Sequence, residues 1–270
     1  PGEMTREIST GGRFLYAPLR EFSASLAVTP ERLVWLRMLS LAGLSCLSVI
    51  LLKILLLSNW RLVPAAVCSI VIIASPSASV IGGWATCWPY SWAALFAILG
   101  FLTAQWSFQT LQNGKMMYPL IWIIFSSLLI IASALIYQPA TFFYLIPLLG
   151  LLLGVHGNNR NVFLLCVLHI VFLGTTLVVA LLIMKLGLSM LDLDSNSRVA
   201  FTNNPLGKFE WFVTSLLPNS VNFLTLRGHR GEHTLIYLLT ACTILCPIFG
   251  YYLKIIFYQS VSHSLHILFV

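Results

Sequence analysis

Long apolar runs separated by short polar turns dominate this chain. A membrane-spanning helix needs about 20 apolar residues, because backbone polar groups in hydrocarbon must be satisfied within their own helix. Seven runs approach or reach that length, and residues 264–270 have the composition of an eighth helix cut off by the chain end. The pattern therefore predicts an all-α, polytopic transmembrane helix bundle. The predicted spans are residues 34–58, 62–80, 91–105, 118–137, 140–155, 162–184 and 235–258.

The segment Tyr137-Gln138-Pro139 separates two of these runs, which together are too long for one helix. A proline disfavours helical conformation in the residue before it, so we expect a helical hairpin at this point. Gln138 would lie at the mouth of the hairpin, where a buried amide must bond to a helix, a water or a ligand. A turn that satisfies the glutamine by itself is the alternative interpretation.

The composition excludes a soluble globular enzyme. Hydrophobic residues make up 59% of the chain and charged residues only 9%, against roughly a quarter in soluble domains. The sequence has no glycine-rich phosphate loop, paired-cysteine metal motif or HExxH. The net charge of +7 does not indicate a nucleic-acid-binding protein, because the basic residues mostly flank the apolar runs. In addition, the chain has no run of basic residues interleaved with aromatic residues.

The basic residues in the short turns predict how the bundle is oriented. Cytoplasmic loops are enriched in Lys and Arg, whereas the turns at 81–90 and 137–139 contain neither. We therefore expect the other turns to be cytoplasmic and the aromatic-rich turn at 84–92 to lie at the outer interface. The basic turn residues are Lys53, Arg61, Lys115, Arg160 and Lys254.

This orientation divides the chain into four parts. Residues 1–33 form an outer-face segment, and residues 34–184 form a six-span bundle. Residues 185–234 form a second outer-face loop with an amphipathic helix, and residues 235–270 hold the last full span and the start of another. Because the chain begins with proline and an outer segment, we expect at least one helix upstream.

None of the eight carboxylates lies in an apolar run, which argues against a proton-coupled transporter and favours work at the outer surface. Glu3 and Glu7 are four residues apart and could share a helix face as a general base with a metal or phosphate partner. Such a pair more often belongs to a solvated interfacial segment, which is the alternative interpretation. Asp192 and Asp194 could coordinate a divalent cation, although such a run more often forms a turn.

The segment after residue 204 has the spacing of an amphipathic helix in the membrane interface, with Phe209 and Val213 on its apolar face. Arg198 and Lys208 could hold a lipid phosphate or act as snorkelling anchors. Within the apolar runs, His169 is expected to pack against a neighbour's polar group, and the pair Gly150 and Gly154 predicts close helix packing.

Three segments carry a resemblance to a known family: Gly11-Gly12-Arg13-Phe14-Leu15, the hairpin at 136–145 and the stretch 208–211. Together they resemble polytopic bacterial glycosyltransferases of the GT-C class, in particular the membrane glucosyltransferases that modify O-antigen of lipopolysaccharide. The resemblance implies an outer loop with catalytic carboxylates, followed by a bundle of spans. The family's acidic pair precedes the Gly-Arg motif, and here only Glu3 and Glu7 do so. We expect the pair upstream of Pro1, and the alternative is that one of these glutamates takes its place.

The resemblance implies transfer of a hexose from a polyprenyl-phosphate donor to a glycan or lipid-linked acceptor, and the sugar it implies is glucose. The implied location of this reaction is the periplasmic face of the bacterial inner membrane. Membrane lipid would be a further partner. Whether the reaction requires a divalent cation is left open. The alternatives are a lipid-linked polysaccharide flippase or polymerase and a non-catalytic membrane assembly subunit. The catalytic candidates are Glu3 and Glu7, and the substrate-binding candidates are Arg13, Tyr137, Gln138, Arg198, Lys208 and Trp211.

Overall fold

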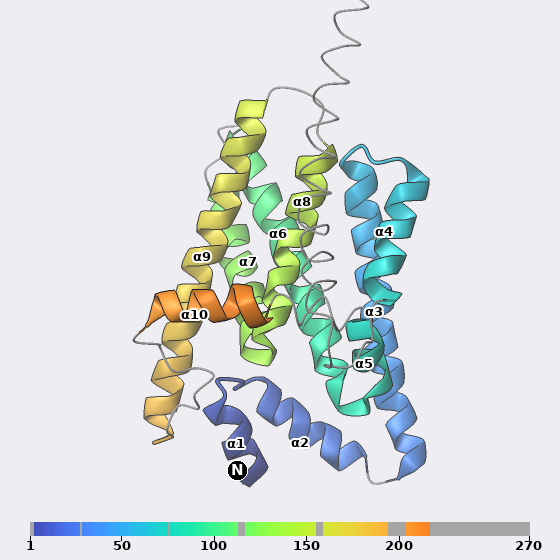
Figure 1. The fold of residues 1–270 in the computed structure, drawn as a ribbon, viewed down its shortest axis with the longest axis vertical. Coiled ribbons are helices and arrows are strands. Elements are labelled where there is room, and N and C mark those ends of the chain that lie inside the picture. Colours follow the sequence, from blue (N-terminus) through green and yellow to red (C-terminus); the bar gives the residue numbers. More distant parts are fainter. Residues whose placement is uncertain are drawn as a thin grey trace, which may run out of the picture. The chain divides into compact units, whose positions relative to one another are not determined.

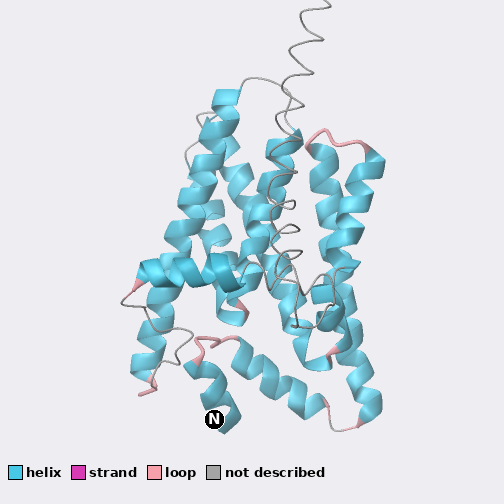
Figure 2. Cartoon of the chain, viewed as in Figure 1, coloured by secondary structure: helices cyan, strands magenta, loops and turns pink. Residues whose placement is uncertain are grey.

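A computed structural model describes residues 3–27, 29–74, 76–112, 117–154, 159–193 and 204–216. All regular secondary structure in these ranges is helical, as the sequence predicts (Figure 2). The chain divides into two compact units, Pro1–Ala200 and Phe201–Val270, which are described separately.

The first unit contains eleven of the helical elements that the structure describes (Figure 1). They are α1 (Glu3–Thr10), α2 (Tyr16–Leu26), α3 (Pro30–Leu57), α4 (Leu62–Ala74), α5 (Pro76–Gly83), the 3₁₀ turn η1 (Ala85–Cys87), α6 (Trp88–Gln112), α7 (Met117–Ile136), the 3₁₀ helix η2 (Gln138–Tyr144), α8 (Leu145–Gly154) and α9 (Asn159–Met190). In the second unit, α10 (Pro205–Trp211) is followed by the π-helical turn η3 (Phe212–Leu216).

Within the described ranges, four helical segments are long and apolar enough to cross a membrane. The segments Leu62–Ala74 and Gln138–Leu153 are apolar but shorter. The chain is therefore a membrane protein whose described residues form only helices, and this described part does not reach the predicted seven complete spans. The predicted runs at 235–258 and 264–270 lie outside the described residues. The four long segments are Glu31–Leu57, Ala85–Leu111, Pro119–Ile136 and Phe163–Met190.

Two described helices cover the predicted span 62–80, and Ser75 between them lies outside the described residues. Helix α4 ends at Ala74, and α5 begins at Pro76. Proline has no N–H, and its ring clashes with the carbonyl group four residues earlier, so it cannot continue a helix but fits the first turn of a new one. Pro76 marks the beginning of α5, and a single continuous span over 62–80 stays a prediction.

The hairpin predicted at Tyr137-Gln138-Pro139 is confirmed. Helix α7 ends at Ile136, and Tyr137 has an extended backbone with φ −156° and ψ 101°. The segment that follows differs from the predicted helix over 140–155, because it begins as η2 and becomes α-helical only at Leu145.

Two predicted boundaries also shift. Helix α3 already begins at Pro30, and α9 continues to Met190. The predicted outer loop 185–234 therefore starts inside a helix, and Lys185 is a residue of α9. The run after Met184 is still mostly apolar, so α9 can extend without exposing many polar groups.

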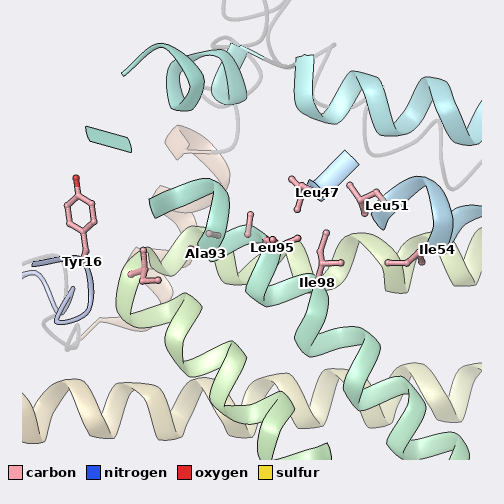
Figure 3. Packing of buried hydrophobic residues seen from close by; sticks show 10 residues of the cluster. Tyr16, Leu47, Leu51, Ile54, Ala93, Leu95 and Ile98 are labelled. Carbon is pink, nitrogen blue, oxygen red and sulfur yellow. The ribbon is translucent and has the colours of Figure 1, made fainter. Parts of the chain in front are cut away.

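Helix α6 lies at the centre of the first unit and contacts α3, α7, α9 and η2. Figure 3 shows the apolar cluster between α3 and α6, in which Leu47 and Leu51 face Leu95 and Ile98. Close approach also involves glycine, since a Cβ atom on Gly150 would lie 2.7 Å from Cδ2 of Leu55. The predicted close packing at Gly150 is thus confirmed.

Candidate functional site

The segment α1–α2 lies across the end of the bundle where α6 begins and α7 ends (Figure 1). The backbone N–H of Leu15 donates to the carbonyl of Leu135 at 3.3 Å, and the indole of Trp88 donates to the hydroxyl of Ser23 at 2.8 Å. A Cβ atom on Gly187 would lie 2.9 Å from the ring of Phe14, so this ring packs directly on α9. Contacts with three helices hold the segment in place.

A tight turn at Gly11 and Gly12 sets the course of the chain into this end of the bundle. The N–H groups of Gly11 and Gly12 donate to the carbonyls of Ile8 and Ser9 at 3.1 and 2.9 Å. Gly12 is buried and has φ 73°, a left-handed conformation that glycine adopts without steric strain. The turn ends α1 and leads directly into Arg13.

Arg13 contacts two tyrosines from different parts of the chain. Its Nη1 donates to the hydroxyl of Tyr90 at 3.3 Å, and its Cζ lies 5.2 Å from the centre of the Tyr137 ring, a cation–π distance. Tyr90 and Tyr137 stack on each other at 4.1 Å, and Tyr16 lies 5.2 Å from Tyr90. We call Arg13, Tyr16, Tyr90 and Tyr137 the Arg13 cluster.

Gln138 joins the cluster to the glycine turn. Its Nε2 donates to the carbonyl of Gly11 at 3.2 Å and approaches Sδ of Met184 at 3.9 Å. The bonded residues Gly11 and Gln138 are 127 positions apart in sequence. The hairpin glutamine is therefore satisfied by a backbone carbonyl of the N-terminal segment.

The Arg13 cluster is a positively charged site beside aromatic rings. Arg13 and Arg20 are both close enough to the Cys87 thiol to act on it electrostatically. Arg13 is half-buried, and among the described residues its guanidinium makes one hydrogen bond, to Tyr90. Since a guanidinium carries five N–H donors, most of them can bind an external anion.

The structure brings three of the predicted site residues together, namely Arg13, Tyr137 and Gln138. Glu3 and Glu7 both belong to α1, one turn apart as predicted, and the Glu7 side chain is exposed. Among the described side chains no contact joins Glu7 to the Arg13 cluster, and the side chain of Glu3 lies outside the described residues.

The remaining predicted residues lie elsewhere. Arg198 and Asp194 fall outside the described residues, and Lys208 and Trp211 are exposed on α10 in the second unit. Asp192 is exposed in the turn after α9 with φ 49°, a conformation common where helices end, which favours the turn interpretation. Among the described residues, no group of three or more His, Cys, Asp or Glu could hold a metal ion.

Sequence analysis missed Tyr16 and Tyr90 as members of the Arg13 cluster, and Arg20 as a second positive charge near Cys87. Tyr16 and Arg20 are one helical turn apart and closely follow Arg13, which is a signal that could have been used. Tyr90 was interpreted only as part of an interfacial aromatic belt, because its stacking partner is in a different turn of the chain.

Comparisons of this chain with protein-family models, with curated proteins and with solved structures found no match. Function is therefore argued from the geometry and chemistry of the site.

Proposed function

We propose that this chain is a membrane glycosyltransferase of the GT-C class. It would transfer a hexose from a polyprenyl-phosphate donor to a glycan or lipid-linked acceptor, and the resemblance to known glucosyltransferases favours glucose as this hexose. The observation that carries the proposal is the half-buried guanidinium of Arg13, held by Tyr90 and Tyr137 at one end of an apolar helix bundle.

The chemistry of the Arg13 cluster suits a phosphate attached to a lipid. Arginine binds phosphate through parallel N–H donors, and the charge stabilises the phosphate as it leaves the sugar. The tyrosine rings offer an apolar surface with polar hydroxyl groups at its edge, which can face a sugar ring. The polyprenyl chain would lie along the apolar outer surface of the helices.

The acceptor hydroxyl needs a general base within reach of its proton. Glu7 is an exposed carboxylate on α1, whose chain leads through the glycine turn to Arg13, and Glu3 is one turn earlier. These two residues are the catalytic candidates of the proposal. Arg198, Lys208 and Trp211 remain substrate-binding candidates from the second outer loop, and a divalent cation remains an open requirement.

The proposal includes the architecture that the apolar runs predict. Seven complete spans and the start of an eighth would cross the inner membrane of a bacterium, with residues 1–33 and 185–234 on the periplasmic side. Donor and acceptor would then meet at the end of the bundle that carries α1 and α2.

Binding of the donor tests the proposal most directly. The full chain in detergent micelles is titrated with polyprenyl-phosphate glucose, and Arg13→Ala is compared with the parent. We expect the variant to bind about tenfold more weakly or worse, because a charge-assisted bidentate contact is lost. Arg37→Ala is the matched control, since Arg37 is exposed on α3, outside the cluster, and its loss should leave affinity within about twofold.

Equal affinities of the parent and Arg13→Ala would overturn the proposed site. Release of polyprenyl phosphate from the donor, in membranes that contain lipopolysaccharide, then separates the candidate functions. Binding without release would favour a flippase or polymerase that handles the same lipid. Absence of both binding and release in the parent would favour a non-catalytic assembly subunit.

A further inference from the structure

A hydrogen-bonded triad lies inside the bundle, away from the Arg13 cluster. The hydroxyl of Tyr144 in η2 lies 2.6 Å from Nδ1 of His169 in α9, and Nε2 of His169 lies 2.7 Å from Oε1 of Gln105 in α6. His169 and Tyr144 are completely buried. The expectation that His169 packs against a neighbour's polar group is thus confirmed, and we call these three residues the His169 triad.

The partners assign a proton to each bond of the triad. An amide oxygen only accepts hydrogen bonds, so Nε2 of His169 donates to Gln105. In a neutral imidazole Nδ1 is then an acceptor, and the Tyr144 hydroxyl donates to it. His169 bonds to both of the other members, whereas Tyr144 and Gln105 each bond to His169, so removing one partner leaves an unpaired polar group in the core.

Aromatic rings enclose the triad and make such an unpaired group costly. Phe101 stacks on the His169 ring at 4.6 Å, and Phe108 meets it edge-on at 5.0 Å. Phe101 also meets the Tyr144 ring edge-on at 5.4 Å. In apolar surroundings the hydrogen bonds are strong and an orphaned donor or acceptor is expensive, hence the triad fixes the relative positions of α6, η2 and α9.

The His169 triad holds η2, and η2 together with the preceding Tyr137 is the segment that contacts the Arg13 cluster. Tyr144 is the last residue of η2, whose first residue is Gln138. A 3₁₀ helix of seven residues is long for its type and has poor internal hydrogen-bond geometry, so it depends on contacts with its surroundings. Besides the triad, the buried hydroxyls of Thr141 and Ser133 meet at 3.4 Å.

We infer that Tyr144, His169 and Gln105 are positioning residues for the candidate site. Through η2 they hold Tyr137 against Arg13 and Gln138 against Gly11. The role of the site itself rests on the proposed function, whereas the positioning is a property of the fold that can be measured without any ligand.

The test measures the proximity of Gln138 to Gly11 by disulfide crosslinking. The full-length double variant Gly11→Cys, Gln138→Cys is oxidised in membranes, and the crosslinked peptide is quantified by mass spectrometry over time. Adding Tyr144→Phe removes only the hydroxyl and keeps the ring. We expect it to slow crosslinking about fivefold or more, because η2 loses its anchor on α9.

Two further variants separate positioning from a general loss of packing. Ser126→Ala removes a buried hydroxyl that bonds to the carbonyl of Gly100 at 2.6 Å, between α7 and α6, and it should crosslink at the parental rate. His169→Gln keeps an acceptor for Tyr144 and a donor for Gln105, so it should retain most of the rate, whereas His169→Leu should resemble Tyr144→Phe.

Equal rates for the parent and Tyr144→Phe would overturn the inference, as would equal slowing by Ser126→Ala. If Tyr144→Phe does not accumulate in membranes, Gln105→Leu replaces it, because that amide is on α6 and outside η2. A parental rate in Gln105→Leu would then overturn the inference. The proposed function fails separately, when donor binding is unaffected by Arg13→Ala although crosslinking behaves as expected.

Discussion

The guanidinium of Arg13 is oriented by two tyrosines through different interactions. Tyr90 accepts a hydrogen bond from it, and the ring of Tyr137 lies beneath its charge. The two rings also stack on each other, so each stabilises the position of the other. The arginine is therefore held in one place while most of its donors remain available for an anion.

The Tyr90 hydroxyl should matter more for ligand binding than for stability. Tyr90→Phe keeps the stack on Tyr137 but leaves Arg13 less constrained, and we expect donor affinity to fall by about three- to tenfold. Titration with polyprenyl-phosphate glucose measures the change. Ser126→Ala is the control, because the buried Ser126 hydroxyl bonds to the carbonyl of Gly100, outside the Arg13 cluster. An equal loss of affinity in both variants would contradict the assigned role of Tyr90.

The conformation of Gly12 predicts a loss of stability on substitution. Gly12→Ala places a Cβ atom on a residue with φ 73°, which costs roughly 1–2 kcal/mol for an L-residue. We expect a lower Tm in micelles, measured by thermal unfolding. Gly83→Ala adds the same atom at the exposed end of α5, where nothing lies within 4 Å, and should change Tm little. Similar shifts in both variants would contradict the strained-turn explanation.

At this scale the sequence indicates some site residues and not others. Arg13 follows a glycine pair, and Gln138 precedes a helix-breaking proline. Both polar residues interrupt the apolar pattern and can be identified in the sequence. Tyr90 has no such mark, because it is one aromatic among several in the turn at 84–92. Its role depends on a stacking contact with Tyr137 that only the folded chain creates.

At the scale of elements, two prolines at helix boundaries show what hydrophobic runs leave out. Pro139 identified the hairpin after α7 correctly, because it follows a polar glutamine that already interrupts the run. Pro76 stands among small residues of similar hydropathy, so the hydropathy of the run 62–80 does not indicate where α5 begins. Backbone hydrogen bonding, rather than hydrophobicity, sets these boundaries.

The contact between α6 and α7 depends on the absence of a side chain at Gly100. A Cβ atom there would lie 2.9 Å from Cγ1 of Ile130, which is completely buried. Gly100→Ala should therefore lower stability by about 1–3 kcal/mol through overpacking, seen as a lower Tm in micelles. Gly174→Ala on α9 is the control, because nothing lies within 4 Å of its Cβ position.

A compensating substitution tests the stated cause. Ile130→Val in the Gly100→Ala background removes Cδ1, which lies 3.5 Å from the added Cβ, and the shorter side chain can shift Cγ1 away from it, so it should restore part of the lost Tm. A Tm that falls further in the double variant, or an equal fall in Gly174→Ala, would show that helix propensity or another effect dominates.

At the scale of the whole molecule, the apolar runs predict the fold class but not the number of spans. Long apolar runs such as those of α3 and α9 have no stable alternative to a membrane helix. Composition alone therefore predicts that these runs are membrane helices. The shorter segments α4 and α8 can be parts of broken spans or packed half-helices, which depends on neighbouring elements. The sequence contains no local signal that distinguishes these outcomes.

Basic residues lie at both ends of the first unit, which makes orientation a question for experiment. Lys53 and Arg61 flank the turn between α3 and α4, and the enrichment of Lys and Arg in cytoplasmic loops favours a cytoplasmic position for that turn. The opposite end carries arginines in α1, α2 and the first turns of α3, and by the same rule they favour that end as cytoplasmic. The proposed function requires the α1–α2 end to face the periplasm.

Single cysteines at the two ends decide between these orientations. Ser25→Cys is exposed on α2, and Leu62→Cys is exposed at the start of α4, each in a chain whose six native cysteines are replaced by alanine. A membrane-impermeant maleimide added to intact spheroplasts should label Ser25→Cys and spare Leu62→Cys until the membrane is opened. The reverse pattern would place the Arg13 cluster in the cytoplasm and exclude transfer at the outer face, because the donor phosphate would then have to be bound on the inner side.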